Sequence, residues 1–236
     1  MKFTLFIPTL NEVEGVKAIM PKIKKEWVDE IIIVDGHSTD GTKEYLESHG
    51  YKVITQTLPR TMGAWWEGFQ AAKGDVIIPF SPDGNSIPEK IPELVEKMKQ
   101  GYDMVIVSRY KDKAKSDDDD FLSSLANHLI TKLINILFRA DYTDTLVMYR
   151  AFKKELLGKL DLHQNTGKEF NYYKVGLYEI LLSIRCAKHK LKFTEISGDE
   201  PERIGGSKIS RAHPNTIAKA YNGLLMIFNV FKEFLI

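Results

Sequence analysis

Two carboxylates directly follow apolar, strand-like runs, in positions where a side chain is presented to a ligand. Asp35 ends the run "IIIVD", and Asp83 follows "DVIIPF" within the turn "SPDGN". The next helix begins too far from Asp35 for this carboxylate to cap it, so we expect it to accept a hydrogen bond from a ligand N–H, such as uracil N3–H or guanine N1–H. Asp83 has two interpretations: it faces a ligand, or it caps a helix that Pro88 begins.

The stretch "VDGHSTDGT" surrounds Asp35 with small and polar residues. Ser38 or Thr39 can cap the following helix. Asp40 in the first turn of that helix opposes the helix dipole, so a structural role is the better interpretation of this acid. Gly36 and Gly41 allow the tight backbone that the loop needs.

Strand-like and helical segments alternate along the first part of the chain. Strands are predicted at 3–7, 30–34, 51–55, 75–80 and 103–107, and helices at 13–25, 40–49, 62–73 and 88–100. This alternation predicts an α/β fold with a mainly parallel sheet covered by helices. Ligands bind such sheets outside the carboxyl ends of the strands, which is where Asp35 and Asp83 lie.

The pattern changes after residue 108. The run "YKDKAKSDDDD" predicts a solvated, mobile loop rather than a metal site, because four adjacent acids cannot all face one ion; a loop that folds over a bound ligand is the alternative. Helices are predicted at 121–139, at "YEILLSIRCAKHK" and, opened by Pro214, at 215–236, with a strand at 192–196. The apolar stripes of the first and last of these helices indicate core or an oligomer contact, with an interfacial membrane contact as the alternative.

Composition and missing motifs exclude several classes of protein. The 33 basic and 32 acidic side chains give a net charge of +1, which provides no electrostatic reason to expect a nucleic-acid partner. The single cysteine, Cys186, excludes an internal disulfide and fits a reducing compartment. The fingerprints of dinucleotide-binding, P-loop, α/β-hydrolase and zincin sites are absent. No uninterrupted apolar run reaches about 18 residues, so we do not expect an integral membrane protein.

The segment "IPTLNE" followed by "VDGHSTDGT" resembles the nucleotide-binding half of the inverting family 2 glycosyltransferases, which have the GT-A fold. The resemblance implies a Rossmann-like, mostly parallel sheet flanked by helices. It also implies that Pro8, Thr9 and Glu12 lie around the ribose and base of a sugar nucleotide, and that Asp35 contacts the base.

The resemblance covers about residues 3 to 210 and divides the chain. It implies a glycosyltransferase domain at 1–210, with a nucleotide-binding half at 1–108 and an acceptor half at 109–210. The C-terminal amphipathic helix at 211–236 then follows as an appendage.

The resemblance also gives the Asp83 turn a chemical role. In this family the turn carries Asp-Xaa-Asp, whose acids hold Mg²⁺ or Mn²⁺ against the diphosphate of the sugar nucleotide. Here the sequence is Ser81-Pro82-Asp83, and Asn85 stands where relatives resembling dolichyl-phosphate mannose synthase have an amide ligand. The resemblance therefore implies Asp83 and Asn85 as metal ligands with Ser81 beside the nucleotide, and a metal held more weakly than by two acids.

The second half resembles the polyprenyl-phosphate sugar transferases of this family. The segment "DTLVMYR" matches an acceptor-side segment at Asp144 and Arg150, and Glu179 occupies an acidic position of the family. In "ERIGGSKIS", Arg203 and Lys208 correspond to cations near the diphosphate, which offset the charge that develops on the departing nucleotide.

The implied reaction is a direct displacement, with inversion, from a UDP- or GDP-sugar to a polyprenyl phosphate or a saccharide. A lipid phosphate is already anionic and needs only positioning, whereas a sugar hydroxyl needs a base. Asp144 is the first candidate for this base and Glu179 the second, and Arg150 or Arg185 is an alternative ionic partner for either.

Two other functions remain open at this point. A non-catalytic relative that binds a sugar nucleotide is consistent with the acid lost at Ser81. A nucleotidyltransferase is the more distant alternative, because "IPTLNEVEG" lacks the glycine-rich, basic loop that grips a triphosphate. For a transferase we expect a cytoplasmic location, at the inner face of a membrane if the acceptor is a lipid.

Overall fold

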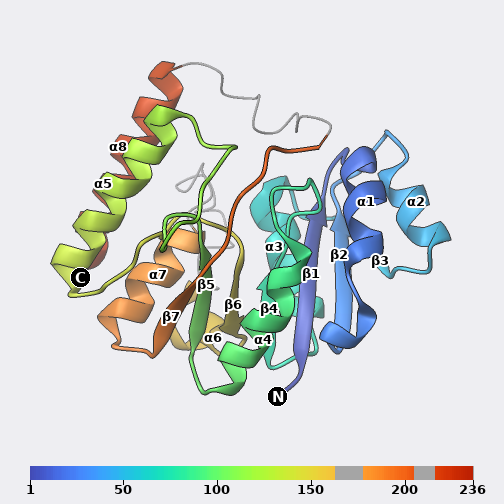
Figure 1. Ribbon diagram of the computed structural model, residues 1–236, viewed down its shortest axis with the longest axis horizontal. Helices are drawn as coiled ribbons and strands as arrows, with labels where there is room; N and C mark the ends of the chain where they lie inside the picture. Colours follow the sequence, from blue (N-terminus) through green and yellow to red (C-terminus); the bar gives the residue numbers. More distant parts are fainter. Residues whose placement is uncertain (163–177, 205–215, 236) are drawn as a thin grey trace.

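The computed structural model describes residues 1–162, 178–204 and 216–235, which form a sheet with helices packed against it (Figure 1). In the described residues the sheet has seven strands in the order β3-β2-β1-β4-β6-β5-β7. They are β1 (Phe3–Thr9), β2 (Glu30–Asp35), β3 (Val53–Thr55), β4 (Val76–Pro79), β5 (Met104–Ser108), β6 (Arg150–Lys153) and β7 (Phe193–Ser197).

The predicted α/β fold is confirmed, and all six predicted strands form. β3, β2, β1 and β4 run parallel to one another, and β5 pairs in parallel with β7. The sheet is mixed, however, because β6 runs antiparallel between β4 and β5. This strand lies at the end of the segment "DTLVMYR" and was not predicted, since its four residues, Arg150–Lys153, are too few to show a periodicity.

The predicted helices also form, with shifted bounds. They are α1 (Val13–Ile19), α2 (Thr42–Ser48), α3 (Arg60–Ala71), α4 (Ile91–Lys99), α5 (Phe121–Phe138), α7 (Tyr178–Lys188) and α8 (Thr216–Leu235), with a short α6 (Leu156–Lys159) that was not predicted. The helix expected at 13–25 breaks into α1 and two 3₁₀ turns, Met20–Lys22 and Lys25–Trp27, at Pro21. α3 packs on β1 and β2, and α4 packs on β5 and β6 (Figure 1).

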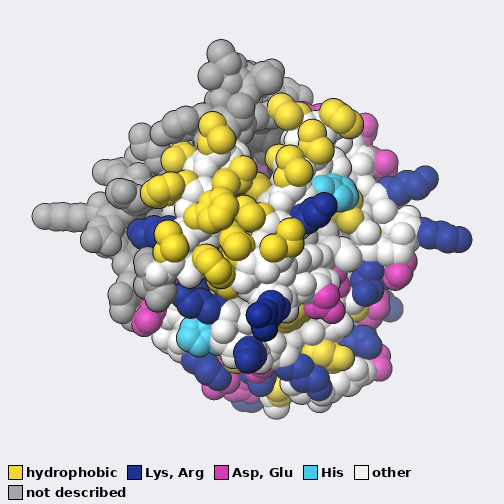
Figure 2. Space-filling view, turned by 90° about the vertical axis from the view of Figure 1, so that its left-hand side faces the viewer, with side chains coloured by type: hydrophobic (Ala, Val, Ile, Leu, Met, Phe, Trp, Pro, Cys, Tyr) yellow, Lys and Arg dark blue, Asp and Glu magenta, His cyan; other side chains and the backbone are white. Residues whose placement is uncertain are grey.

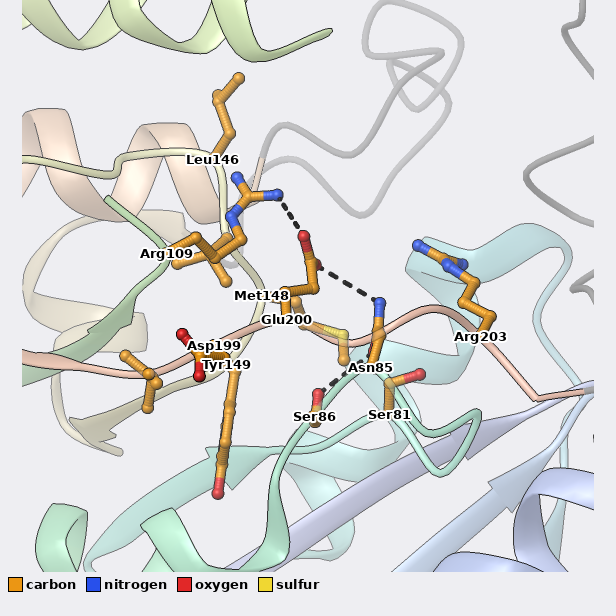
Figure 3. A pocket seen from close by; sticks show the side chains of 13 residues that line it. Ser81, Asn85, Ser86, Arg109, Leu146, Met148, Tyr149, Asp199, Glu200 and Arg203 are labelled. Atoms are coloured by element: carbon orange, nitrogen blue, oxygen red, sulfur yellow. Dashed lines mark hydrogen bonds and ion pairs between the residues drawn. The ribbon is translucent and has the colours of Figure 1, made fainter. Parts of the chain in front are cut away.

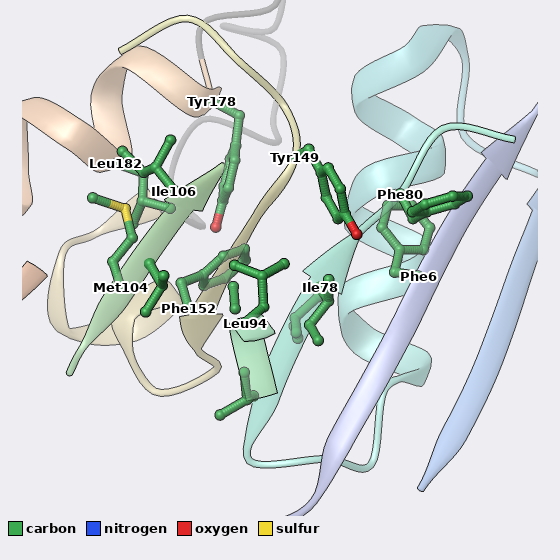
Figure 4. Close-up of a cluster of buried hydrophobic side chains, with 14 of the residues drawn as sticks. Phe6, Ile78, Phe80, Leu94, Met104, Ile106, Tyr149, Phe152, Tyr178 and Leu182 are labelled. Atoms are coloured by element: carbon green, nitrogen blue, oxygen red, sulfur yellow. The ribbon is translucent and has the colours of Figure 1, made fainter. Parts of the chain in front are cut away.

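Aromatic side chains join the sheet to its helices. The ring of Phe6 on β1 meets Trp65 and Phe69 of α3 edge to face, with centroids 5.8 and 5.6 Å apart. Gly68 makes this approach possible, because a Cβ there would lie 2.1 Å from the Phe6 ring. The cluster continues through Phe152 of β6 to Tyr178 of α7 (Figure 4). This cluster therefore connects β1 and β6 to α3 and α7.

α5 is the one described helix that is long and apolar enough to cross a membrane by length and composition, with a mean hydropathy of 1.3. Only 22% of it is buried inside the domain. The sequence-based search for uninterrupted apolar runs missed α5, because Asn127, Thr131, Lys132 and Asn135 interrupt its apolar residues.

Arg150 is fully buried at the start of β6. Its guanidinium donates hydrogen bonds to the carbonyls of Thr145 and Val147 and to the carbonyl of Glu179 on α7, at 3.2, 3.1 and 3.0 Å, and to Ser183 Oγ at 2.9 Å. It therefore fastens the loop before β6 to α7, rather than pairing with the carboxylate of Asp144 or Glu179 as considered from sequence.

Arg150→Met should lower the free energy of unfolding by about 3 kcal/mol, because several buried carbonyls lose their donor. Urea denaturation measures the effect, with Arg139→Met, a change at an exposed arginine that ends α5, as the matched control. An unchanged midpoint for Arg150→Met would contradict the fastening role.

Candidate active site

The carboxyl ends of β1 and β2 are joined by Asp35. Thr9 lies opposite Asp35 in the parallel register and donates from Oγ1 to Asp35 Oδ1 at 3.1 Å. The backbone N–H and the hydroxyl of Ser38 donate to the same carboxylate at 2.9 and 2.6 Å. Asp35 is completely buried beneath these groups. The structure therefore leaves no exposed part of Asp35 for the predicted contact with a base.

The loop after β1 is tied to the loop after β2. The backbone N–H groups of Glu12 and Val13 donate to Thr42 Oγ1 and Asp40 Oδ2 at 2.9 and 3.1 Å. Asp40 also accepts from the backbone N–H of Thr42 at 3.0 Å, which confirms its structural role. The prediction that Ser38 or Thr39 caps α2 is wrong: α2 has no side-chain cap bond, and Ser38 is engaged by Asp35.

Asp83 lies in the turn after β4 and is only 2% exposed. Its Oδ2 is 3.3 Å from Arg203 Nη1, and its backbone carbonyl accepts a hydrogen bond from Ile204 N–H at 2.6 Å. Gly15 of α1 allows the turn to come this close, because a Cβ there would lie 2.6 Å from the carbonyl oxygen of Pro82. The alternative role of Asp83 as a helix cap is wrong, because the 3₁₀ turn Pro88–Lys90 and α4 have no side-chain cap bond.

Glu12 lies close enough to Asp83 for the two charges to interact. Burial, followed by repulsion from Asp83, raises the pKa of Glu12 to about 7, while Arg203 acts in the opposite direction. The guanidinium of Arg203 thus pairs with Asp83 and also acts electrostatically on Glu12. Such an arrangement attracts positive charge, and Arg203 supplies it here.

A divalent cation fits these residues only with help from other ligands. No group of three or more His, Cys, Asp or Glu side chains suitable for a metal occurs among the described residues. Asp83, the amide oxygen of Asn85 and the hydroxyl of Ser81 are all hard oxygen donors. Mg²⁺ often takes one or two protein carboxylates and fills its remaining positions with phosphate oxygens and water. The donor set thus fits a cation that arrives with a diphosphate.

A pocket of about 240 Å³ opens above the Asp83 turn (Figure 3). Ser81, Asn85 and Arg203 line it from the side of this turn, and Arg109 and Glu200 line it from the second half of the chain. Leu146, Val147 and Met148 add an apolar wall. The structure therefore brings three predicted site residues to one pocket, next to a fourth, Asp83, which contacts Arg203.

Arg109 is a charged pocket residue that the sequence analysis missed. Its guanidinium binds Asp144 through two parallel hydrogen bonds of 2.7 and 3.0 Å, and its Nη1 lies 3.1 Å from both Asp119 Oδ2 and Glu200 Oε2. Arg109 follows β5 directly, so the rule that selected Asp35 and Asp83 could have found it.

Neither predicted general base lines the pocket. Asp144 is fully buried behind Arg109 and accepts a further hydrogen bond from Asn127 at 2.8 Å. Although burial opposes it, Arg109 keeps the pKa of Asp144 below its ordinary value. Glu179 lies in the first turn of α7, where burial raises its pKa to about 7. Arg185, considered as a partner for either acid, instead binds Glu233 of α8.

The acidic run before α5 is exposed at Asp117, Asp118 and Asp120, as expected of a solvated loop, but three of its acids bind specific groups. Asp118 binds Arg203 at 2.9 Å, Asp119 binds Arg109 at 3.1 Å, and Asp120 caps α5 by accepting from the backbone N–H of Ser123 at 2.8 Å. Each of these acids thus has a different partner, which a count of like charges cannot reveal. Through Asp118 and Asp119 the run thus binds the two arginines that line the pocket. Lys208, the second predicted diphosphate cation, lies outside the described residues.

Comparison with known proteins identifies the family. Residues 4–161 match the model of glycosyl transferase family 2. The chain belongs to glycosyl transferase family 2. This assignment confirms the family that the motifs around Thr9 and Asp35 suggested.

Curated relatives of the chain include enzymes named for polyprenyl phosphates. An undecaprenyl-phosphate 4-deoxy-4-formamido-L-arabinose transferase of Aeromonas hydrophila is 29% identical over 166 residues, covering 65% of this chain and 49% of the relative. A dolichol-phosphate mannosyltransferase of Pyrococcus furiosus is 30% identical over 173 residues, which cover 69% of this chain and 49% of the relative. The chain spans about half the length of these relatives.

Solved structures confirm the GT-A type of fold. Glucosyl-3-phosphoglycerate synthase of Mycobacterium tuberculosis, in complex with UDP, superposes with a TM-score of 0.66 at 17% identity, over 100% of this chain and 80% of that one. The same enzyme with Mn²⁺, UDP-glucose and phosphoglyceric acid superposes with a TM-score of 0.65 at 15% identity, over 100% of this chain and 80% of that one.

The raised pKa of Glu12 predicts a pH-dependent stability. Between its ordinary value of 4.5 and about 7, the folded protein holds a proton that the unfolded chain has released, so the free energy of unfolding falls as the pH rises through this window. Above about pH 7, Glu12→Gln should raise the free energy of unfolding by about 1 kcal/mol, a value reduced for the partial exposure of the group. At about pH 4, where both states are protonated, it should have no effect.

Urea denaturation at the two pH values measures this difference. Glu14→Gln, which changes an exposed carboxylate in the first turn of α1, is the matched control and should leave stability unchanged at both pH values. An equal effect of Glu12→Gln at both pH values would contradict the pKa assignment.

Proposed function

We propose that this protein is an inverting glycosyltransferase that moves a sugar from a UDP- or GDP-sugar to a polyprenyl phosphate, assisted by Mg²⁺ or Mn²⁺. The observation that carries the proposal is the ion pair between Asp83 and Arg203, whose guanidinium lines the pocket, with Glu12 close enough to interact with both charges. A sugar nucleotide needs a cationic site for its diphosphate, and the relatives named above act on undecaprenyl phosphate and dolichol phosphate.

The donor half of the site would hold the nucleotide at the ends of β1, β2 and β4. Pro8, Thr9 and Asp35 lie at the ends of β1 and β2, where we place the ribose and base. Asp83 and Asn85 would hold the metal, which, when bound, neutralises charge on the two phosphates. Structures of the mycobacterial synthase contain UDP with Mn²⁺ or Mg²⁺, which supports a divalent ion for this chain.

Arg203 is placed to take part in departure of the nucleotide. It already faces Asp83 and is held from the other side by Asp118. A guanidinium in this position can donate to phosphate oxygens as their charge increases in the transition state. We assign Lys208 the same role on sequence grounds.

The acceptor half favours a phosphate over a sugar hydroxyl. A hydroxyl acceptor needs a base in contact with it, but Asp144 and Glu179 do not line the pocket. A phosphate acceptor needs a cation, and Arg109 lines the pocket with its guanidinium oriented by Asp144. We therefore propose that Asp144 acts by positioning Arg109, and that Arg109 binds the acceptor phosphate.

Asp83→Ala should abolish metal-enhanced binding of the donor, with at least about a tenfold loss of affinity, because the cation loses its carboxylate ligand. Calorimetric titration with UDP-, GDP- and CDP-sugars, first with Mn²⁺ and then with a chelator, measures this loss and identifies the base. Asp141→Ala, at an exposed acid before β6, is the control. Tight binding that is indifferent to both chelator and Asp83→Ala would support a metal-independent or non-catalytic binding protein instead.

Arg109→Lys should raise KM for a short-chain polyprenyl phosphate by about tenfold, because lysine keeps the charge but loses the paired hydrogen bonds to Asp144. The affinity for the donor should not change, since Arg109 is assigned to the acceptor. Steady-state kinetics and donor titration separate the two effects, with Arg139→Lys as the control. Unchanged acceptor kinetics would exclude Arg109 as the phosphate ligand.

A further inference from the structure

The helices α5 and α8 lie side by side and expose apolar side chains on the same face of the molecule (Figures 1 and 2). Their C-terminal ends meet where Phe138 packs edge-on against Phe234, with ring centroids 5.9 Å apart. We call the exposed set the α5/α8 face. It consists of Phe121, Leu122, Leu125, Leu129 and Ile136 of α5 with Leu224, Phe228, Phe231, Phe234 and Leu235 of α8.

α5 presents its polar side to the domain and its apolar side outward. Asn127 donates to Asp144 at 2.8 Å, Thr131 shares a hydrogen bond with Thr145 at 2.8 Å, and Asn135 donates to the carbonyl of Tyr142 at 2.8 Å. On the other side, Leu129 and Ile136 are 56% and 66% exposed. A helix that faces water has the opposite arrangement. The α5/α8 face is therefore matched to an apolar environment outside the domain.

Charge on and around this face identifies the environment. Lys132 is exposed on α5 between Leu129 and Ile136, and Arg139, Lys188 and Lys232 are exposed around the C-terminal ends of the two helices. α5 carries no acidic residue, and the single acid of α8, Glu233, is buried against Arg185. A second copy that packed face to face would bring these cations together. Anionic lipid headgroups would instead pair with them while the apolar side chains enter the acyl boundary.

We propose that the α5/α8 face binds the surface of a membrane that contains anionic lipids. The helices lie in the headgroup plane without crossing it, because Asn127, Thr131 and Asn135 keep α5 hydrogen-bonded to the domain. The Asp118–Asp120 segment leads directly into α5 and binds Arg203 and Arg109, so the membrane face and the pocket are joined through three residues. The purpose of this contact rests on the proposed function, since it brings the pocket to a lipid-linked phosphate.

Co-sedimentation with vesicles tests the proposal. The protein should bind vesicles of phosphatidylcholine and phosphatidylglycerol in equal parts, and bind more weakly to phosphatidylcholine alone. The double variant Leu129→Glu/Phe228→Glu should lose at least about tenfold in vesicle affinity, because two large apolar side chains no longer enter the interface. Leu58→Glu, at an exposed leucine before α3, should bind as the unchanged protein does. Lys132→Glu should remove most of the preference for the anionic vesicles, whereas Lys17→Glu on α1 should not.

Two outcomes would overturn the proposed membrane docking. The first is that the protein does not bind vesicles. The second is that light scattering without lipid detects a dimer and the double variant dissociates it, because a second copy would then cover the α5/α8 face. Circular dichroism and thermal unfolding confirm that each variant is folded. Transfer to a short-chain polyprenyl phosphate in detergent is measured in parallel: transfer without vesicle binding refutes only the docking, and vesicle binding without transfer refutes only the proposed function.

Discussion

The ion pair between Asp83 and Arg203 is the contact on which the site depends. Asp83 is almost completely buried, and a buried carboxylate without a cation is strongly destabilising. The guanidinium compensates that charge and also moderates the repulsion between Asp83 and Glu12. The turn after β4 is therefore built to hold positive charge, which the proposed binding of a donor diphosphate with its cation would require.

The same use of charge links the two halves of the chain. Arg203 is held between Asp83 and Asp118, and Arg109 lies among Asp119, Asp144 and Glu200. All these groups surround or adjoin one pocket. Arginine is suited to this role because its fork can bind a protein carboxylate and a phosphate with the same geometry. The acidic side chains therefore hold the two arginines in place before any substrate arrives.

Much of this arrangement could be predicted from the sequence because it follows local patterns. The alternation of apolar strands and helices gave the order of elements through β5, and the rule that ligands bind at the carboxyl ends of strands selected Asp35 and Asp83. β6 was missed because a strand of four residues has no measurable period. Ser38 was misassigned as a helix cap. Its backbone N–H and its hydroxyl instead donate to the carboxylate of Asp35, three residues earlier.

The partners of the charged residues were beyond such reasoning. Arg109 meets Asp144 after 35 residues and Glu200 after 91, and no local pattern encodes those separations. For the same reason the acidic run before α5 resembled a solvated loop, although three of its members bind specific groups. The inward-facing polar side of α5 was likewise hidden, because its periodicity shows an apolar stripe without showing which side faces the domain.

The most direct test of the account is a crystal structure of the protein with a UDP- or GDP-sugar and manganese, in which anomalous scattering locates the metal. The account predicts manganese bound to Asp83, with Arg203 turned from this carboxylate toward the phosphates. An intact ion pair between Asp83 and Arg203, with manganese absent from the turn, would contradict it.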